Sequence, residues 1–216
     1  MTLSRYGIRE WGLATAAAVA AAIFAWPSGW LLALVVVLWI SVVGFFRDPL
    51  LRKPASTSPN DLVSPADGVV SAVLEVDHHD AVDGKATIVR IFLSVLDVHI
   101  NRSPCDGIVT AITHTPGKYL DARTEESARV NECNLITMVR PQGDRLGIRQ
   151  VSGAIARRIV CATEVGSTLA RGERVGMIKF GSTTELILPT RASTVIRVAK
   201  GDRVTGGVTI LATVTS

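Results

Sequence analysis

The longest apolar stretch of the chain lies near its N-terminus, where residues 11–46 contain no charged side chain. The stretch is interrupted once, by the Pro-Ser-Gly sequence at 27–29, which ends a helix and permits a turn. The two halves, 11–26 and 30–46, are each about 25 Å long as helices, slightly short of the roughly 30 Å hydrocarbon core of a bilayer. The pattern predicts a hydrophobic helical hairpin that either spans the membrane or dips into it.

Positive side chains flank both ends of this apolar stretch. Arg5 and Arg9 precede it, and Arg47, Arg52 and Lys53 follow it. Because loops rich in Lys and Arg stay on the cytoplasmic side, we expect the rest of the chain on the cytoplasmic face of the cell membrane. A cleaved signal peptide fits poorly, since the apolar stretch is about twice too long and no clear cleavage site follows it.

Beyond the hairpin the pattern changes to short apolar runs that are rich in Val, Ile and Thr and bounded by Gly, Pro or Asp, as is typical of β-strands. A linker at 47–62, rich in Pro, Ser and Asp, separates the anchor at 1–46 from a domain at 63–216. Helical periodicity is scarce, and residues 120–131 form either one short helix or a loop. We predict a mainly β domain with a barrel or paired-sheet architecture. The predicted strands are 68–76, 86–95, 107–114, 134–139, 146–151, 155–161, 174–180, 185–188, 194–198 and 208–214.

Two weak internal repeats refine the fold prediction. The segment Pro-Ala-Asp-Gly-Val-Val at 65–70 returns at 104–109 as Pro-Cys-Asp-Gly-Ile-Val, and each copy places an Asp-Gly turn before a strand. The segments 170–176 and 199–206 share a small-residue turn followed by a basic residue and Val. This second pair resembles the hammerhead-like turns of biotinyl- and lipoyl-type domains, so we expect a barrel-sandwich-hybrid-like β domain. The attachment lysine of a carrier domain does not stand out at either turn.

Composition narrows the classes of function. The 216 residues are 48% hydrophobic and 19% charged, with a net charge of +4 and no Lys/Arg block of the kind that binds nucleic acid. Nucleic acid is therefore not an expected partner, whereas mild positive charge beside an apolar segment suits an anionic lipid surface. Cys105, Cys133 and Cys161 lack CxxC spacing, which favours reduced thiols, and no metal site is expected.

Histidines and one Gly-Ser pair are the candidates for chemistry. His78 and His79 lie in a polar segment that we predict to be a solvated turn, without metal-ligand spacing around them. His99 ends an apolar run, where a lone histidine is more often structural than catalytic. Gly181 and Ser182 indicate a turn at a strand end, because the second glycine of a G-x-S-x-G nucleophile elbow and the spacing of a phosphate loop are absent.

Six short segments, taken in order, change this picture. They are Ser64-Pro65-Ala66-Asp67-Gly68, Phe92-Leu93-Ser94 with Asp97-Val98-His99-Ile100-Asn101-Arg102-Ser103-Pro104, Pro116-Gly117-Lys118, Asn131-Glu132-Cys133-Asn134, Ala156-Arg157-Arg158-Ile159 and Gly176-Met177-Ile178-Lys179-Phe180-Gly181-Ser182. Together they resemble phosphatidylserine decarboxylase proenzymes, in particular the short, membrane-anchored form. The resemblance covers about residues 60–190, and the N-terminal hairpin fits it as well.

The resemblance implies self-cleavage between Gly181 and Ser182, with Ser182 converted into a covalent pyruvoyl group, the pyruvate cofactor of this family. The products would be a large chain, 1–181, and a small chain, 182–216. The pyruvoyl carbonyl would form a Schiff base with the amine of phosphatidylserine and accept the electrons released with carbon dioxide. The product would be phosphatidylethanolamine, which makes the chain the zymogen of a carboxy-lyase of phospholipid biosynthesis.

The resemblance also gives roles to individual residues. Ser182 would attack the carbonyl of Gly181, and His99 would take the hydroxyl proton while Asp67 holds the imidazole in one tautomer. His99 is also the candidate acid of the decarboxylation. Larger family members carry a second histidine three residues further on, where this chain has Arg102. Either His99 serves both steps, or Arg102 does something different, such as binding the phosphate or carboxylate of the lipid substrate.

Alternatives to this function remain open at the level of sequence. The same chemistry on a related phosphoserine lipid, such as archaetidylserine, would carry the same motifs. A non-enzymatic, membrane-tethered barrel-sandwich module would stay uncut and be indifferent to the Ser182 hydroxyl. The expected partners are a membrane phospholipid and the two chains of one cleaved molecule, and a homo-oligomer is left open.

Overall fold

The computed structural model describes residues 2–154, 158–179 and 181–215. The chain divides into two compact units, Met1–Leu51 and Arg52–Ser216. The first three residues of the predicted strand 155–161, the end of the predicted strand 174–180 and part of the motif at 156–159 therefore lie outside the described residues.

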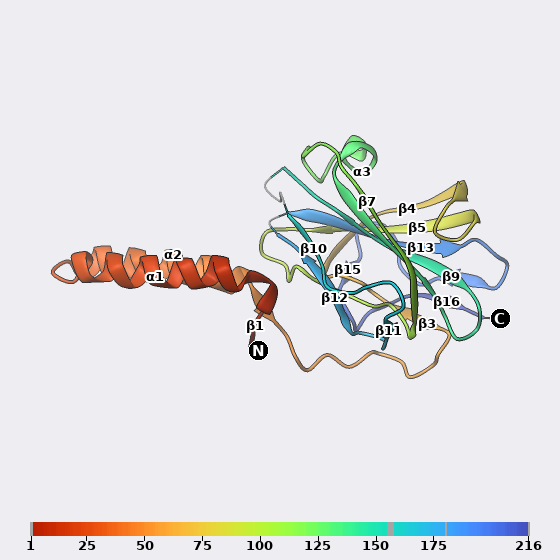
Figure 1. Ribbon diagram of the computed structural model, residues 1–216, viewed down its shortest axis with the longest axis horizontal. Helices are drawn as coiled ribbons and strands as arrows, with labels where there is room; N and C mark the ends of the chain where they lie inside the picture. Colours follow the sequence, from red (N-terminus) through yellow and green to blue (C-terminus); the bar gives the residue numbers. More distant parts are fainter. Residues whose placement is uncertain (1, 155–157, 180, 216) are drawn as a thin grey trace. The chain divides into compact units, whose positions relative to one another are not determined.

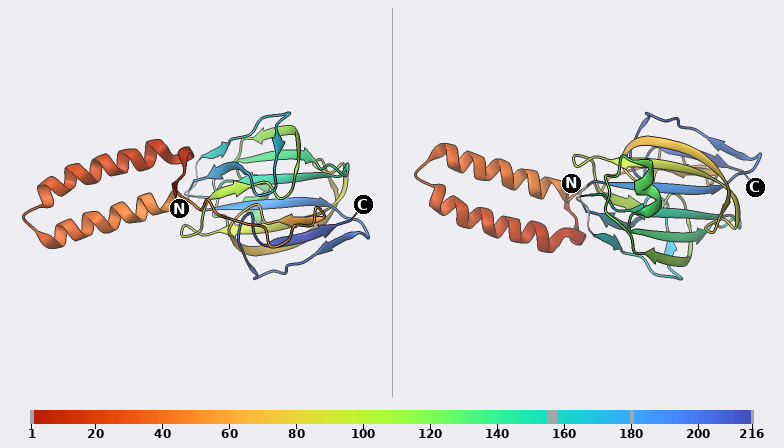
Figure 2. Two further views of the ribbon diagram at one scale, coloured as in Figure 1. Left: turned by 90° about the horizontal axis from the view of Figure 1, so that it is seen from below. Right: turned by 90° about the horizontal axis from the view of Figure 1, so that it is seen from above.

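The first unit contains the predicted helical hairpin, which is confirmed (Figures 1 and 2). Its helices are α1 (Ile8–Ala25) and α2 (Gly29–Phe45), preceded by the 3-10 turn η1 (Arg5–Gly7). The short antiparallel strands β1 (Thr2–Leu3) and β2 (Arg47–Asp48) pair with each other across the open end of the hairpin. Among the described residues, the helical stretch Arg5–Ala25 is long and apolar enough to cross a membrane, whereas Gly29–Phe45 is shorter.

A chain of hydrogen bonds joins the two helices. The indole Nε1 of Trp39 donates to Thr15 Oγ1 at 3.0 Å, and the Thr15 hydroxyl donates to the carbonyl of Trp11 at 2.7 Å. In hydrocarbon an unsatisfied polar group costs several kcal/mol, roughly, so a polar atom inside the hairpin needs a partner. This pairing accounts for Trp39, which lies within the apolar run rather than at its interfacial ends.

The second unit is mainly β, as predicted (Figure 1). Within the described residues, the largest sheet has eight antiparallel strands in the order β11-β7-β8-β9-β13-β5-β4-β15 and curls into half a barrel, beside the three-stranded sheets β10-β12-β6 and β14-β16-β3. The strands are β3 (Asp61–Val63), β4 (Gly68–His79), β5 (Gly84–Leu93), β6 (Ile100–Arg102), β7 (Gly107–Thr115), β8 (Cys133–Val139), β9 (Arg145–Val151), β10 (Ile159–Cys161), β11 (Thr168–Leu169), β12 (Arg174–Ile178), β13 (Ser182–Pro189), β14 (Thr194–Ile196), β15 (Arg203–Val204) and β16 (Ile210–Val214).

Two local predictions are refined by the structure. His78 and His79 are the last residues of β4 rather than part of a turn, so that prediction was wrong; the turn follows them at 80–83, where Asp83 takes a left-handed conformation with φ 54°. The region 120–131 is part loop and part helix. The helix α3 (Glu125–Val130) begins after Thr124, whose hydroxyl accepts a hydrogen bond from the Ser127 backbone N–H.

Strand β13 runs through the middle of the large sheet and is buried along its whole length. Its neighbours β5 and β9 place Leu93 opposite Ser182 and Val151 opposite Thr183. Apolar side chains of these and adjacent strands form the core below it, including Val89, Ile91, Ile136, Ile148, Leu186 and Leu188. Because a central strand is fixed on both sides by hydrogen bonds, the first residues of β13 are held in a defined place.

Candidate active site

The Gly181–Ser182 junction lies at the start of β13. Gly181 has φ +63°, a left-handed conformation that glycine adopts without the steric cost of a side chain. Ser182 is fully buried, and its Oγ has no hydrogen-bond partner among the residues that the structure describes. A buried hydroxyl without a partner costs about 1–3 kcal/mol, so the junction carries a polar group that the described residues do not satisfy.

The imidazole of His99 contacts this junction. The backbone N–H of Gly181 donates to Nε2 of His99 at 3.2 Å, and Nδ1 lies 3.0 Å from the carbonyl oxygen of Asp97. The two contacts fit a neutral imidazole with its proton on Nδ1, donated to Asp97, and a lone pair on Nε2 facing the junction. His99 and Ser182 are both fully buried, so the imidazole and the hydroxyl are shielded from bulk water.

A tight turn at residues 94–97 positions His99. The Asp97 carboxylate accepts from the Ser94 backbone N–H at 2.8 Å, and the Asp97 N–H donates to the Ser94 carbonyl at 2.9 Å. Arg203 contacts the other carboxylate oxygen of Asp97 at 3.3 Å. These contacts fix the orientation of the Asp97 carbonyl group, and that carbonyl in turn holds the imidazole.

Asp67 lies in the Asp-Gly turn before β4, where its carboxylate binds Arg52. Nη2 of Arg52 donates to Oδ2 at 2.7 Å, Nη1 donates to Oδ1, and the backbone N–H of Gly206 donates to Oδ1 at 2.8 Å. The Arg52 side chain is only 9% exposed. The carboxylate thus joins the start of this unit to its C-terminal region, and the role of Asp67 in orienting His99 stays a prediction.

Arg102, a candidate for substrate binding, is buried on β6. Its Nη1 donates to the carbonyl oxygen of Gly172 at 2.9 Å, and its backbone N–H donates to the Pro65 carbonyl at 2.9 Å. The side chain also packs against Gly207, where an added Cβ would lie 3.0 Å from the Arg102 Cδ. These contacts favour a structural role for part of the guanidinium group, and its contact with substrate stays a prediction.

A buried chain of polar side chains below the junction was not predicted. Asn134 donates to Gln150 at 3.1 Å, Gln150 donates to Asn101 at 2.9 Å, and Asn101 donates to the hydroxyl of Thr184 at 2.9 Å. Each of these residues is at most 3% exposed. The one signal in the sequence was the presence of amide residues inside runs that otherwise have the composition of strands.

The next residue of β13, Glu185, is also buried and charged. Its carboxylate lies 2.7 Å from Nε of Arg90 on β5 and 3.0 Å from Nη1 of Arg149 on β9. The register places both arginines directly opposite Glu185 on the two flanking strands. Buried charges persist when they are paired in this way, so these contacts fix the registers of β5 and β9 relative to β13.

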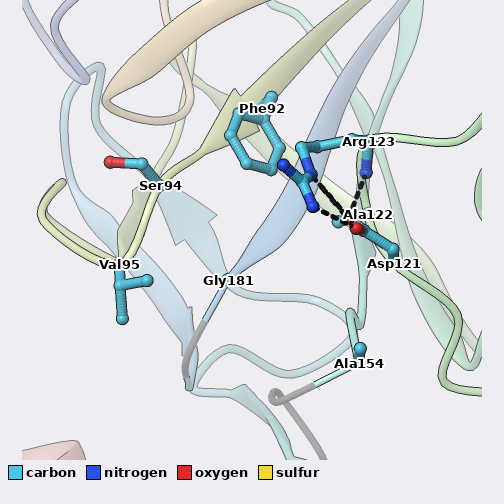
Figure 3. Close-up of a pocket in the computed structure, with 8 residues that line it drawn as sticks. All are labelled: Phe92, Ser94, Val95, Asp121, Ala122, Arg123, Ala154 and Gly181. Atoms are coloured by element: carbon cyan, nitrogen blue, oxygen red, sulfur yellow. Dashed lines mark hydrogen bonds and ion pairs between the residues drawn. The ribbon is translucent and has the colours of Figure 1, made fainter.

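A pocket of about 370 Å³ opens beside the junction (Figure 3). Ser94 and Val95 lie on one side of Gly181, and Phe92, Asp121 and Arg123 lie on the other. The lining is mostly apolar and consists of Phe92, Ser94, Val95, Asp121, Ala122, Arg123, Ala154 and Gly181.

An ion pair at this pocket supplies its charged groups. Nη2 of Arg123 lies 2.6 Å from Oδ2 of Asp121, and Nε lies 3.0 Å from Oδ1. Hydrogen bonds from the side chain and backbone of Arg123 lower the pKa of Asp121 to about 2. Both groups are therefore charged at neutral pH, and a guanidinium stands beside the junction.

The fold and the site define a class: a β domain that follows an apolar helical hairpin in the sequence, with a Gly-Ser junction in which the glycine is left-handed, a histidine against it and an adjoining pocket. Comparison with known proteins narrows this class. The family model described as phosphatidylserine decarboxylase matches residues 40–212. The chain therefore belongs to the phosphatidylserine decarboxylase family, which is a family of enzymes.

Curated relatives agree over most of the chain. A phosphatidylserine decarboxylase proenzyme of Symbiobacterium thermophilum is 43% identical over 209 residues, covering 97% of this chain and 94% of the relative. That of Solidesulfovibrio magneticus is 39% identical over 211 residues, covering 97% and 95%. A third, from Desulfotalea psychrophila, is 42% identical over 167 residues, covering 77% and 76%.

Proposed function

We propose that this chain is a zymogen that cuts itself between Gly181 and Ser182 and then decarboxylates phosphatidylserine to phosphatidylethanolamine. The observation that carries the proposal is the buried Ser182 hydroxyl, which has no hydrogen-bond partner in the described part of the chain and lies at a junction contacted by His99. The relatives are named proenzymes, which agrees with a chain that needs cleavage. In this proposal the anchor is 1–46, the linker 47–62 and the decarboxylase domain 63–216.

The cleavage needs only residues of the chain and water. Oγ of Ser182 bonds to the carbonyl carbon of Gly181, the peptide C–N bond breaks, and the freed nitrogen gains a proton, which leaves an ester. His99 takes the hydroxyl proton at Nε2 and passes it to the leaving nitrogen. Loss of the Ser182 α-proton then expels the Gly181 carboxylate, and water replaces the nitrogen, which leaves as ammonia.

The site fits the pyruvoyl group that this sequence of steps produces at residue 182. Ser182 supplies three carbons in a buried position, and the pocket next to Gly181 gives a substrate amine access to it. The group supplies a carbonyl that binds an amine and draws the electron pair of a departing carboxylate. Nε2 of His99 would take up the proton that the substrate ammonium group loses and would later donate it to the substrate carbon, while the buried surroundings keep water away from that carbon.

The charged groups around the pocket suit a lipid headgroup. A phosphoserine headgroup carries a phosphate and a carboxylate, and Arg123 presents a guanidinium group at the pocket. Arg102 remains a second candidate for the same anionic groups. Arg123→Ala should raise KM for phosphatidylserine with little change in kcat, whereas Arg129→Ala, on the exposed side of α3, should change neither.

The hairpin indicates where in the cell the enzyme would act. We propose that it anchors the enzyme in the cell membrane with the catalytic domain on the cytoplasmic side, consistent with the Arg and Lys residues at both of its ends. A substrate that never leaves the bilayer then meets the site at a high effective concentration. The large chain 1–181 and small chain 182–216 remain associated through β13 and its neighbours.

The direct test of activity is release of carbon dioxide from carboxyl-labelled phosphatidylserine in vesicles by the full-length protein. Wild type should release it, Ser182→Ala should not, and Ser71→Ala, a half-buried serine on β4, should match wild type. A second set of vesicles with archaetidylserine distinguishes the two lipid substrates. Release by Ser182→Ala at the wild-type rate would contradict the proposal.

A further inference from the structure

The carbonyl group of the scissile peptide bond lies against a second glycine. A Cβ atom added to Gly153 would lie 2.2 Å from the Gly181 carbonyl oxygen and 3.1 Å from its carbonyl carbon. The sheet register explains the approach: β9 ends with Val151 opposite Thr183, and the chain continues toward Gly181. Real Cβ atoms do not come this close to a backbone oxygen, so every other residue type would displace one of the two segments.

The two glycines are required for different reasons. Gly181 has a left-handed φ of +63°, yet an added Cβ there would meet no atom of the described residues within 4 Å. Gly153 has no left-handed φ, and its added Cβ would overlap the neighbouring carbonyl. Glycine is therefore used at 181 for its backbone conformation and at 153 for its missing side chain.

The buried side chain of Asn131 holds the surroundings of Gly153 in place. Its Nδ2 donates to the carbonyl oxygens of Leu120 and Ser152, each at 2.9 Å, and its Oδ1 accepts from the Leu120 N–H at 2.9 Å. Asn131 is 2% exposed. One amide thus ties together the two segments that flank the junction, 120–122 and 152–153.

Strand β13, which begins at Ser182, holds the other side of the space around Gly153. The Thr183 hydroxyl donates to the Ala122 carbonyl at 3.3 Å, and the Ala122 Cβ lies 3.2 Å from the position of a Cβ on Gly153. The space beside the Gly181 carbonyl therefore accommodates a glycine at position 153 but no larger residue. Any extra methyl group in it has to push against the scissile carbonyl or against the loop.

From this geometry we propose that Gly153 and Asn131 are positioning residues for self-cleavage: Gly153 leaves the space that the Gly181 carbonyl group occupies beside it, and Asn131 fixes the walls of that space. The inference rests on the proposed self-cleavage. When Oγ of Ser182 bonds to the carbonyl carbon, that carbon becomes tetrahedral and its oxygen leaves the peptide plane. A methyl group on Gly153 would shift the carbonyl by about 1 Å, which costs roughly 100-fold in rate.

The test follows the conversion of newly made, full-length chain into two chains over time, with circular dichroism to check folding. Gly153→Ala should be cut about 100-fold more slowly than wild type while it keeps a cooperative thermal transition. The matched control is Gly84→Ala, because an added Cβ there meets nothing within 4 Å and the φ is not left-handed. A folded Gly153→Ala chain that is cut at the wild-type rate would overturn the inference.

A second variant keeps the test decisive if Gly153→Ala does not fold. Asn131→Asp loses both Nδ2 donors and keeps the acceptor for the Leu120 N–H, so cleavage should slow at least about tenfold while the folded fraction stays near that of wild type. Cleavage of this variant at the wild-type rate would likewise overturn the inference. Wild type that stays in one piece would instead contradict the proposed self-cleavage, so the two failures are distinguishable.

Discussion

At the scale of single residues, the proposed nucleophile lacks a hydrogen-bond partner among the described residues, and the proposed base is already engaged. The Ser182 hydroxyl has no hydrogen-bond partner among the described residues, while Nε2 of His99 accepts the N–H of Gly181. For proton transfer, Nε2 has to exchange this N–H for the serine hydroxyl. Both groups lie at the same junction, because Nε2 contacts the N–H of Gly181 and Ser182 is the next residue.

Replacement of His99 tests this arrangement. His99→Ala should slow self-cleavage about 100-fold or more, because a positioned general base contributes roughly that factor. His78→Ala, whose imidazole is exposed at the end of β4, should leave the rate unchanged. Gel analysis of newly synthesised protein measures both cleavage rates. Cleavage of His99→Ala at the wild-type rate would show that His99 is not the general base.

At the scale of elements, polar side chains rather than apolar ones fix the central strand. Asn101 on β6 reaches Thr184 on β13, and Gln150 on β9 links Asn101 to Asn134 on β8. A buried polar network stabilises one arrangement when all of its members are satisfied, and it costs free energy when one is removed. The network therefore ties the start of β13 to three other strands.

Removal of Gln150 should lower the free energy of unfolding. Gln150→Ala leaves the Asn101 Oδ1 and the Asn134 Nδ2 without their partner, at a cost of about 1–3 kcal/mol for each orphaned group. Urea unfolding in detergent, compared with wild type and with the exposed Gln142→Ala, measures the change. A loss no larger than that of the control would show that the network contributes little.

The β4–β5 hairpin should respond to pH through His79. Burial lowers the pKa of His79 below its ordinary value of 6.5, and its Nδ1 accepts the Ala81 N–H at 3.1 Å. As the pH falls below about 6.5, the unfolded chain binds a proton that the folded chain does not, so stability falls until the pH reaches the folded pKa.

Thermal unfolding at about pH 7.5 and about pH 5.5 measures this effect. Wild type should lose more stability on acidification than His79→Asn, whose side-chain oxygen can still accept the Ala81 N–H but does not titrate. His78→Asn, at an exposed position, should behave like wild type. An unchanged pH response in His79→Asn would contradict the assignment.

The sequence predicted those elements that depend on neighbouring residues. The turn at 27–29 places the hairpin because Pro and Gly act locally, and the alternating runs place most strands of the β unit. The register between strands that are distant in the sequence depends on contacts between those strands, which the residue pattern of one strand does not reveal. Arg52 with Asp67, Asn101 with Gln150, and Gly153 with Gly181 became visible only in the folded chain.

At the scale of the whole molecule, the proposed enzyme combines an apolar hairpin with a domain that acts on a lipid. After cell lysis the protein should stay with the membrane fraction in roughly 1 M salt, because salt screens charge but does not weaken apolar insertion. Detergent should release it. Release by salt alone would show that charge, rather than the hairpin at Ile8–Phe45, holds the protein on the membrane.

Intact-mass spectrometry of the purified, folded protein tests the central claim most directly. The account predicts two polypeptides, 1–181 and 182–216, with the smaller one lighter by one ammonia than a chain that begins with an unmodified serine. The same measurement on Ser182→Ala should give one uncut polypeptide. Folded wild-type protein that decarboxylates phosphatidylserine as a single polypeptide, with Ser182 unmodified, would contradict the account.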